Sequence, residues 1–201
     1  MLFRPALLLL FFALPQATTH PSAPASDPSE MPSYTADGRL QPPANYREWI
    51  YLTSGIDMSY SSSANPSHSM FDNVFVNSSA YRSFLETGTW PDKTVLVLET
   101  RGAESPVSIN KRGHTQSSEI MGAEVHVKDN SRGGWSFYSF DDNDKGALLP
   151  RTAPCYSCHE QHGAVDTTFV QFYPTLIGLA KSKGTLSPAY LKEIAPPASS
   201  K

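Results

Sequence analysis

Cys155, Cys158 and His159 form a C-x-x-C-H motif, and these two cysteines are the only ones among the 201 residues. This spacing is typical of c-type haem attachment. Each thiol can add to a vinyl group of haem to form a thioether, and the adjacent imidazole can reach the iron as its proximal ligand. The sequence therefore predicts one covalently bound haem c, attached through Cys155 and Cys158, with His159 as the iron ligand.

Three other chemistries use the same residue types. A thioredoxin-like redox pair lies at the start of a helix that follows a strand, and residues 152–154 do not have the pattern of a strand. A zinc site could combine Cys155, Cys158, His159 and His162, but structural zinc sites usually take two ligands from a second, separated segment. A disulfide across two residues would be strained and would close almost no loop. These alternatives are weaker interpretations than haem attachment.

The first residues have the features of a secretory signal peptide, which we place at residues 1–25. Arg4 supplies the positive charge, and residues 6–14 form an apolar run that ends at Pro15. A membrane span needs about 20 apolar residues, so this run is too short to be one. Cleavage after Ala17 and cleavage after Ala25 both fit the sequence. Because haem is attached to C-x-x-C-H after export, we expect a periplasmic or secreted protein.

The rest of the chain is expected to form one domain between two polar segments. Residues 26–43 are rich in Pro, Ser, Thr and Ala and predict a solvated tether. Residues 44–180 have the length of a single domain, and residues 181–201 predict a flexible C-terminal tail. The formal net charge is −3, with no basic stripe that would favour nucleic acid as a partner.

Hydrophobic periodicity within the domain predicts strands alternating with a few short helices. Strands are expected over residues 71–77, 94–99, 120–128 and 135–140. Asn77 is expected to cap a short helix that Gly88 ends. Three or four antiparallel strands with helices at the ends predict an α+β fold, mainly an antiparallel β-sheet, with haem bound near the C-x-x-C-H segment.

Strand alternation places side chains on opposite faces of the sheet. In the strand over 120–128, Glu124, His126 and Lys128 share one face, opposite Val125 and Val127. From this strand alone, Glu124 and His126 are expected to face solvent. Two aromatic residues of the strand over 71–77, Phe71 and Phe75, are expected either to wall a haem pocket or to fill the core.

Seven segments in this order make the chain similar to the cytochrome P-460 family. They cover nearly all of the predicted domain and are 45–50, 71–88, 90–99, 122–129, 134–140, 155–159 and 166–174. The resemblance implies a fold like that of the cytochrome c′-beta proteins, usually homodimeric, with one haem c and a proximal histidine. The best-known members oxidise hydroxylamine, and others bind nitric oxide or carbon monoxide without that activity.

The resemblance also assigns residues of the haem pocket. In the hydroxylamine-oxidising members a lysine forms a covalent bond to the haem ring, and Leu98 occupies the matching position here. The nearest alternative, Lys93, is five positions earlier and is expected on the opposite face of the strand. The pocket carboxylate of the family matches Glu124, which implies a role in proton relay. We therefore expect an open iron site that binds small nitrogen-oxide or diatomic ligands, without the lysine cross-link.

The competing functions are hydroxylamine oxidation and plain electron transfer. An electron-transfer cytochrome usually closes both axial positions of the iron, often with a methionine, and Met31, Met58, Met70 and Met121 are available. No methionine follows the C-x-x-C-H motif, which favours an open site. The expected partners are a small-molecule ligand or substrate, a redox partner cytochrome, and a second copy of the chain.

Overall fold

The computed structural model describes residues 27–60, 68–140 and 145–196. In this part of the chain six antiparallel strands form one sheet, in which each strand pairs with the next along the sequence. They are β1 (Ile50–Ile56), β2 (Met70–Val76), β3 (Val95–Glu104), β4 (Thr115–Asp129), β5 (Gly134–Phe140) and β6 (Ala147–Leu148). The α+β prediction with an antiparallel sheet is confirmed, although the sheet is larger than predicted. The expected signal peptide lies outside the described residues.

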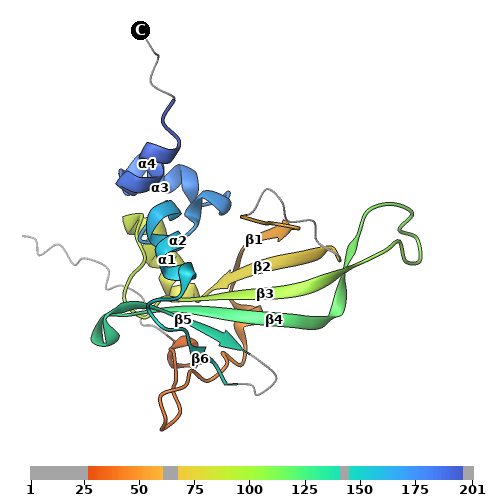
Figure 1. The fold of residues 1–201 in the computed structure, drawn as a ribbon, viewed down its shortest axis with the longest axis horizontal. Coiled ribbons are helices and arrows are strands. Elements are labelled where there is room, and N and C mark those ends of the chain that lie inside the picture. Colours follow the sequence, from red (N-terminus) through yellow and green to blue (C-terminus); the bar gives the residue numbers. More distant parts are fainter. Residues whose placement is uncertain (1–26, 61–67, 141–144, 197–201) are drawn as a thin grey trace, which may run out of the picture.

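The helices are short and gather at one end of the sheet (Figure 1). They are α1 (Ser78–Thr87), α2 (Pro154–His162), α3 (Ile177–Lys183) and α4 (Pro188–Glu193). The described residues also form 3₁₀ helices at Pro28–Glu30, Tyr46–Glu48, Asn130–Arg132 and Val170–Phe172. None of the helices in the described ranges is long and apolar enough to span a membrane.

Each face of the sheet packs against a separate hydrophobic cluster. The helical face includes Leu96 of β3 and Phe137 of β5, packed with Phe84, Leu176 and other residues from the helices. The opposite face includes Val97 and the other buried valines of β3 and β4, together with Leu40, Trp49 and Tyr138. Because successive strand residues point to opposite faces, β3 must be apolar on both faces, as its sequence predicts.

Helix α1 begins and ends where the sequence predicts, but Asn77 acts differently from a simple cap. Its side chain accepts a hydrogen bond from Val95 N at 2.9 Å and donates one to Lys93 O at 3.2 Å. Asn77 is 1% exposed, so it joins the helix start to the start of β3. At the other end Gly88 has a φ of 76°, a left-handed conformation that glycine adopts without steric cost.

The two terminal segments pack on the domain more than their composition suggests. Within the predicted tether, residues 26–43, Leu40 is buried and exchanges backbone hydrogen bonds with Gly146 at 3.2 and 2.8 Å. The predicted tail from residue 181 contains α4 and the end of α3, and Lys183 Nζ donates to Glu86 O at 2.8 Å. In the described parts of these ranges, residues 27–43 and 181–196, the chain therefore makes contacts with distant segments that composition alone does not predict.

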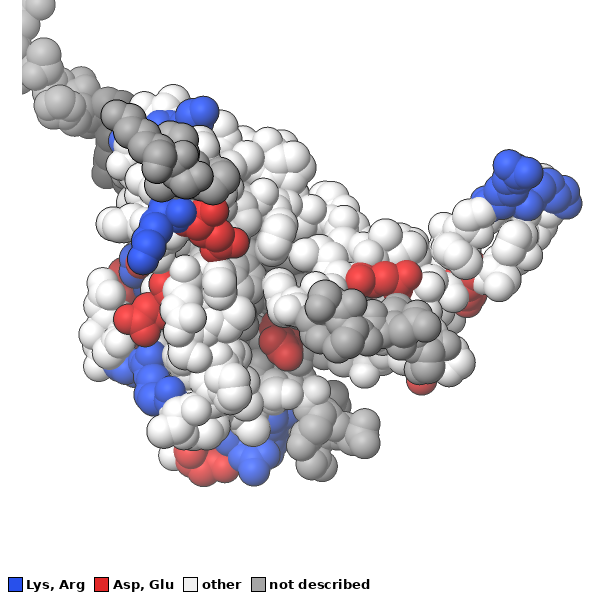
Figure 2. Space-filling view, turned by 45° about the horizontal axis from the view of Figure 1, so that its top comes forward, with Lys and Arg blue, Asp and Glu red and all other residues white. Residues whose placement is uncertain are grey.

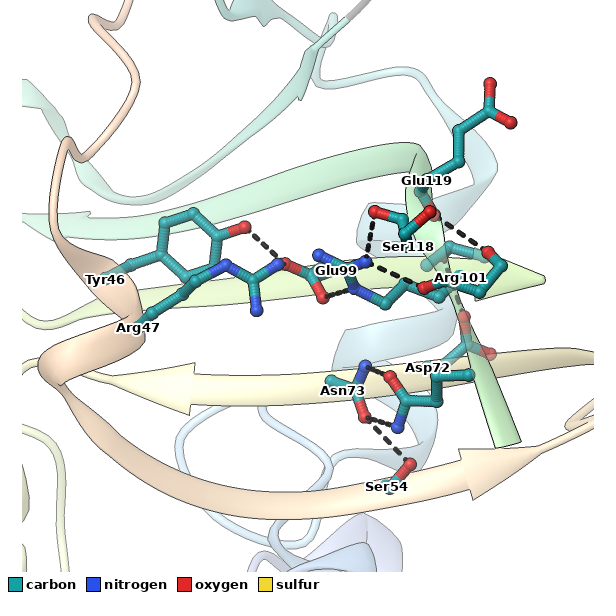
Figure 3. A network of polar contacts seen from close by, with 12 residues as sticks. Tyr46, Arg47, Ser54, Asp72, Asn73, Glu99, Arg101, Ser118 and Glu119 are labelled. Atoms are coloured by element: carbon teal, nitrogen blue, oxygen red, sulfur yellow. Dashed lines mark hydrogen bonds and ion pairs between the residues drawn. The ribbon is translucent and has the colours of Figure 1, made fainter. Parts of the chain in front are cut away.

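A buried carboxylate organises a polar network on the sheet face opposite the helices (Figure 3). Glu99 of β3 is 0% exposed. Its oxygens accept hydrogen bonds from Tyr46 Oη, from the guanidinium of Arg47 and from Arg101 Nε. Arg101 also donates to the carbonyl oxygens of Ser117 and Ser118, at 2.9 and 2.7 Å. The network ties β3 to β4 and to the segment before β1.

The β3–β4 hairpin extends well beyond the rest of the sheet (Figure 1). On the face shown in Figure 2, basic side chains gather at the tip of this extension, and the loop between the two strands contains Lys111 and Arg112. The same loop carries Ile109, which is 92% exposed. Over the helical end, basic and acidic side chains are interspersed.

Candidate functional site

Helix α2 brings the three residues of the C-x-x-C-H motif to one face. Cys155, Cys158 and His159 occupy positions i, i+3 and i+4, which are neighbours on a helix surface. Pro154 opens the helix, at a position where its missing N–H costs no hydrogen bond. Both thiols are free, and all three side chains line a single cavity of about 470 Å³. The sequence predicts the residues but not the helix that aligns them.

The cavity lies between this helix and the helical face of the sheet. Its sheet wall is formed by alternate residues of four adjacent strands: Thr53, Val74, Leu96, Leu98, Glu124 and His126. A third wall comes from the segment after α2 and consists of Thr168, Phe169, Phe172 and Tyr173. The lining is therefore mainly apolar, with a few polar groups.

The His159 ring is fixed by a hydrogen bond and by aromatic contacts. Nδ1 lies 2.8 Å from the carbonyl oxygen of Thr167, so we assign the ring proton to Nδ1 and the lone pair to Nε2. Phe169 stacks on the ring at 4.1 Å between centroids, and Phe137 contacts it at 4.7 Å. Burial lowers the pKa of His159, an effect that the hydrogen bond to Thr167 partly opposes. The neutral imidazole is the form that binds a metal.

These residues fit a covalently attached haem. The cavity volume lies within the range of about 300–1,000 Å³ typical of cofactor sites. Two free thiols and one imidazole with an available Nε2 lone pair open into it together. In the described ranges no cluster of three or more His, Cys, Asp or Glu side chains has the arrangement of a protein-only metal site, so the zinc interpretation gains no support.

Leu98 lies in the middle of the sheet wall. The strand register pairs it with Val74 on one side and with Glu124 on the other, and all three side chains line the cavity. Lys93 is elsewhere: its Nζ lies 2.5 Å from Asp129 Oδ1. This position agrees with the expectation that Lys93 does not take the place of the family's cross-linking lysine, whose position Leu98 occupies here.

Glu124 also lines the cavity, and a second carboxylate, Asp72, lies in the same wall. Partial burial and, to a smaller extent, the negative charge of Asp72 raise the pKa of Glu124. Asp72 accepts a hydrogen bond from Thr100 Oγ1 at 2.8 Å. Asp72 was not among the residues predicted from the sequence, although its alternation with Val74 indicates the same face.

His126 lies beside His159 with its side chain only 16% exposed, so the expectation of a solvent-facing position is wrong. Its ring stacks on Phe137 at 4.0 Å and meets the His159 ring edge to face at 4.9 Å. Burial, with a smaller contribution from His159, lowers the pKa of His126 to about 3. Strand alternation gave its face correctly, but it could not show that α2 and the segment after it cover that face.

Phe71 and Phe75 were expected either to wall a haem pocket or to fill the core, and neither is among the residues that line the cavity. Phe75 packs on the opposite face of the sheet, where its ring contacts Tyr46 at 5.5 Å and Tyr51 at 5.8 Å. Phe71 is four residues earlier in the same strand and shares that face. The residues of β2 in the cavity are Asp72 and Val74.

Met58 and His162 were named from the sequence as alternative metal ligands, and the structure places them differently. Met58 lines the cavity, whereas Met31, Met70 and Met121 are not among its lining residues. His162 is half-exposed, and its Nδ1 lies 2.9 Å from Glu193 Oε2. His162 therefore does not join the C-x-x-C-H group.

Comparison with known proteins identifies one family. The family model described as Cytochrome P460 matches residues 43–170. The matched range begins before β1 and includes the whole sheet, α2 and the C-x-x-C-H motif. No curated protein matches the chain.

Proposed function

Since the chain belongs to the cytochrome P460 family, which implies a haem c protein, we propose that it is an exported mono-haem c cytochrome with an open iron site. Its ligands would be small nitrogen oxides or diatomic gases such as nitric oxide and carbon monoxide. The observation that carries this proposal is the position of Leu98 at the centre of the cavity wall. Bound haem would supply an iron centre that accepts a small ligand and exchanges one electron.

The side chains of α2 would hold the cofactor. Cys155 and Cys158 would form the thioethers, and His159 would donate its Nε2 lone pair to the iron. The hydrogen bond from Nδ1 to Thr167 O keeps the imidazole in the required tautomer and orientation. The rings of Phe169 and Phe137 limit its rotation.

The side chains of the sheet wall would determine which ligands bind and whether they can exchange a proton. Leu98 has no nucleophilic nitrogen, so it cannot form the ring cross-link that the resemblance associates with hydroxylamine oxidation. Val74 and Leu96 add apolar surface beside it, which favours small uncharged ligands. Glu124 and Asp72 supply carboxylates that could accept or return a proton.

Spectra and turnover test the proposal together. Carbon monoxide should change the spectrum of the ferrous protein strongly, and hydroxylamine oxidation with an artificial electron acceptor should be weak or absent. Leu98→Lys places an amine within the cavity wall, and Glu124→Ala removes the proposed proton acceptor. Brisk turnover by the wild-type protein that Glu124→Ala abolishes would contradict the proposal and would favour hydroxylamine oxidation.

One observation favours electron transfer as a second candidate. Met58 lines the cavity, and Gly55 leaves room for it, because a Cβ on Gly55 would lie 2.2 Å from Met58 Sδ. A methionine thioether bound to the iron would close the second axial position. In that case carbon monoxide would bind to Met58→Ala much faster than to the wild-type protein. Equal binding rates would support the open site.

Cellular location and assembly follow as further parts of the proposal. Residues 1–25 would direct export to the periplasm or the medium, where attachment of haem to C-x-x-C-H takes place. A homodimer and a redox partner cytochrome are the proposed protein partners. Fractionation of expressing cells tests the location, because the haem-bearing form should be absent from the cytoplasm.

A further inference from the structure

A tight turn just after α2 supplies the carbonyl that contacts the proximal ligand. Val165 and Thr168 form an antiparallel bridge, with N···O distances of 3.3 and 2.8 Å, around Asp166 and Thr167. Both central residues are left-handed, with φ of 50° and 59°. Non-glycine residues rarely adopt this conformation, and a β-branched threonine does so least readily. Such a turn persists only where its surroundings hold it.

A lysine from the sheet holds the turn from outside. Lys128 of β4 places Nζ 2.5 Å from Asp166 Oδ2 and 2.7 Å from the carbonyl oxygen of Trp90. The Lys128 side chain is only 18% exposed, so this ion pair is shielded from solvent more than a surface pair. Trp90 Nε1 donates to Thr168 Oγ1 at 2.8 Å and fixes the end of the turn.

The turn also lies unusually close to the end of α2. A Cβ on Gly163 would meet the Cα and carbonyl carbon of Thr167 at 2.8 and 2.7 Å, and the carbonyl oxygen of His159 at 2.6 Å. Only glycine allows this approach. The backbone of Thr167 is therefore held against the helix that carries His159, and its carbonyl oxygen is 2.8 Å from His159 Nδ1.

We propose that Lys128 and Asp166 are positioning residues for the proximal ligand. Their ion pair holds the turn so that the Thr167 carbonyl accepts the hydrogen bond from His159 Nδ1. A histidine that donates this bond is a stronger electron donor to a metal, so the pair lowers the reduction potential of the haem. The inference rests on the proposed function, because it requires His159 to bind the haem iron.

The reduction potential of two variants of the haem-loaded protein tests the proposal. Lys128→Met removes the cation but keeps a side chain of similar length. Asp166→Asn removes the anion, and asparagine tolerates the left-handed conformation. Both should weaken the hydrogen bond and raise the potential. A tenfold change in the ferric-to-ferrous equilibrium would appear as a rise of about 59 mV for one electron.

Lys128→Met is the decisive variant, because direct electrostatics predicts the opposite sign. Loss of a nearby positive charge by itself favours the ferric state and lowers the potential, whereas loss of the positioning contact raises it. The resonance Raman iron–histidine stretch of the ferrous protein should move to lower frequency in both variants. Lys93→Met is the matched control, because it breaks an ion pair of equal length, with Asp129, that does not touch the turn.

The outcomes separate this inference from the proposed function. A higher potential in Lys128→Met and Asp166→Asn, with Lys93→Met unchanged or lower, supports it. An unchanged or lower potential in Lys128→Met overturns it while the haem assignment stands. A wild-type chain that carries no covalent haem contradicts the proposed function itself, and this inference with it.

Discussion

Replacing the buried carboxylate of Glu99 by an amide should destabilise the sheet strongly. Glu99→Gln keeps the shape of the side chain but removes the charge that faces Arg47 and Arg101. The Arg47 side chain is 49% exposed and can return to solvent, whereas that of Arg101 is 13% exposed and would stay uncompensated. Breaking a buried ion pair by removing one partner costs about 3–5 kcal/mol.

The carbonyl acceptors that Arg101 keeps, Ser117 and Ser118, place the cost near the lower end of that range. We expect Glu99→Gln to reduce the free energy of unfolding by about 3 kcal/mol. At roughly 2–4 °C per kcal/mol for a chain of this size, the melting temperature falls by about 6–12 °C. Asp37→Asn is the matched control, because its pair with Arg39 is exposed, and it should leave the melting temperature almost unchanged.

The dependence on pH gives a second check. Burial raises the pKa of Glu99, but the hydrogen bonds from Arg101, Tyr46 and Arg47 together outweigh it and leave the pKa lowered. A lowered pKa in the folded state stabilises the protein above the unfolded value of about 4.3, and this contribution disappears as the pH falls through the folded value. The free energies of unfolding of the wild-type protein and of Glu99→Gln, measured with urea, should therefore differ most at neutral pH and converge in acid. Equal stabilities at pH 7 would refute the reasoning.

Three further substitutions test the site and its supports. Gly163→Ala forces a Cβ to within 2.6–2.8 Å of backbone atoms and should cost about 1–3 kcal/mol in thermal unfolding; an unchanged melting temperature would contradict the close approach. Asn77→Ala leaves the backbone N–H of Val95 without its side-chain acceptor and should cost about 1–3 kcal/mol by urea unfolding, against less than about 0.5 kcal/mol for the exposed control Thr87→Ala. His159→Ala should retain the thioethers but lose the axial nitrogen, and an absorption spectrum like that of the wild-type protein would identify a different ligand.

The sequence predicted the fold well where hydrophobic periodicity is local. The strand over 71–77, the helix from Asn77 to Gly88 and the strand over 135–140 all occur within a residue or two of their expected positions. Strand β1 was missed because Ser54 and Gly55 interrupt its apolar pattern, and β6 was missed because it is only two residues long. Apolar patterns as short or as interrupted as these also occur in loops, so neither segment could be predicted as a strand.

The site could be predicted only in part, because sequence gives the face of a strand but not what covers it. The family resemblance assigned Leu98 and Glu124 to one pocket, and in the structure they are neighbours in the sheet register and both line the cavity. His126 was expected in solvent because the segment that buries it lies far along the chain. For Phe71 and Phe75 the sequence left both the haem pocket and the core open, and Phe75 packs in the cluster on the face opposite the cavity.

Covalent attachment of haem is the central claim, and one measurement tests it most directly. The purified wild-type protein is extracted with acidified acetone, and the mass of the intact polypeptide is then determined. We predict that haem stays on the chain, that the mass equals the mature chain plus one unmodified haem, and that replacing both Cys155 and Cys158 by Ser releases the haem. A polypeptide that loses its haem on extraction, or that never carried one, would contradict the account.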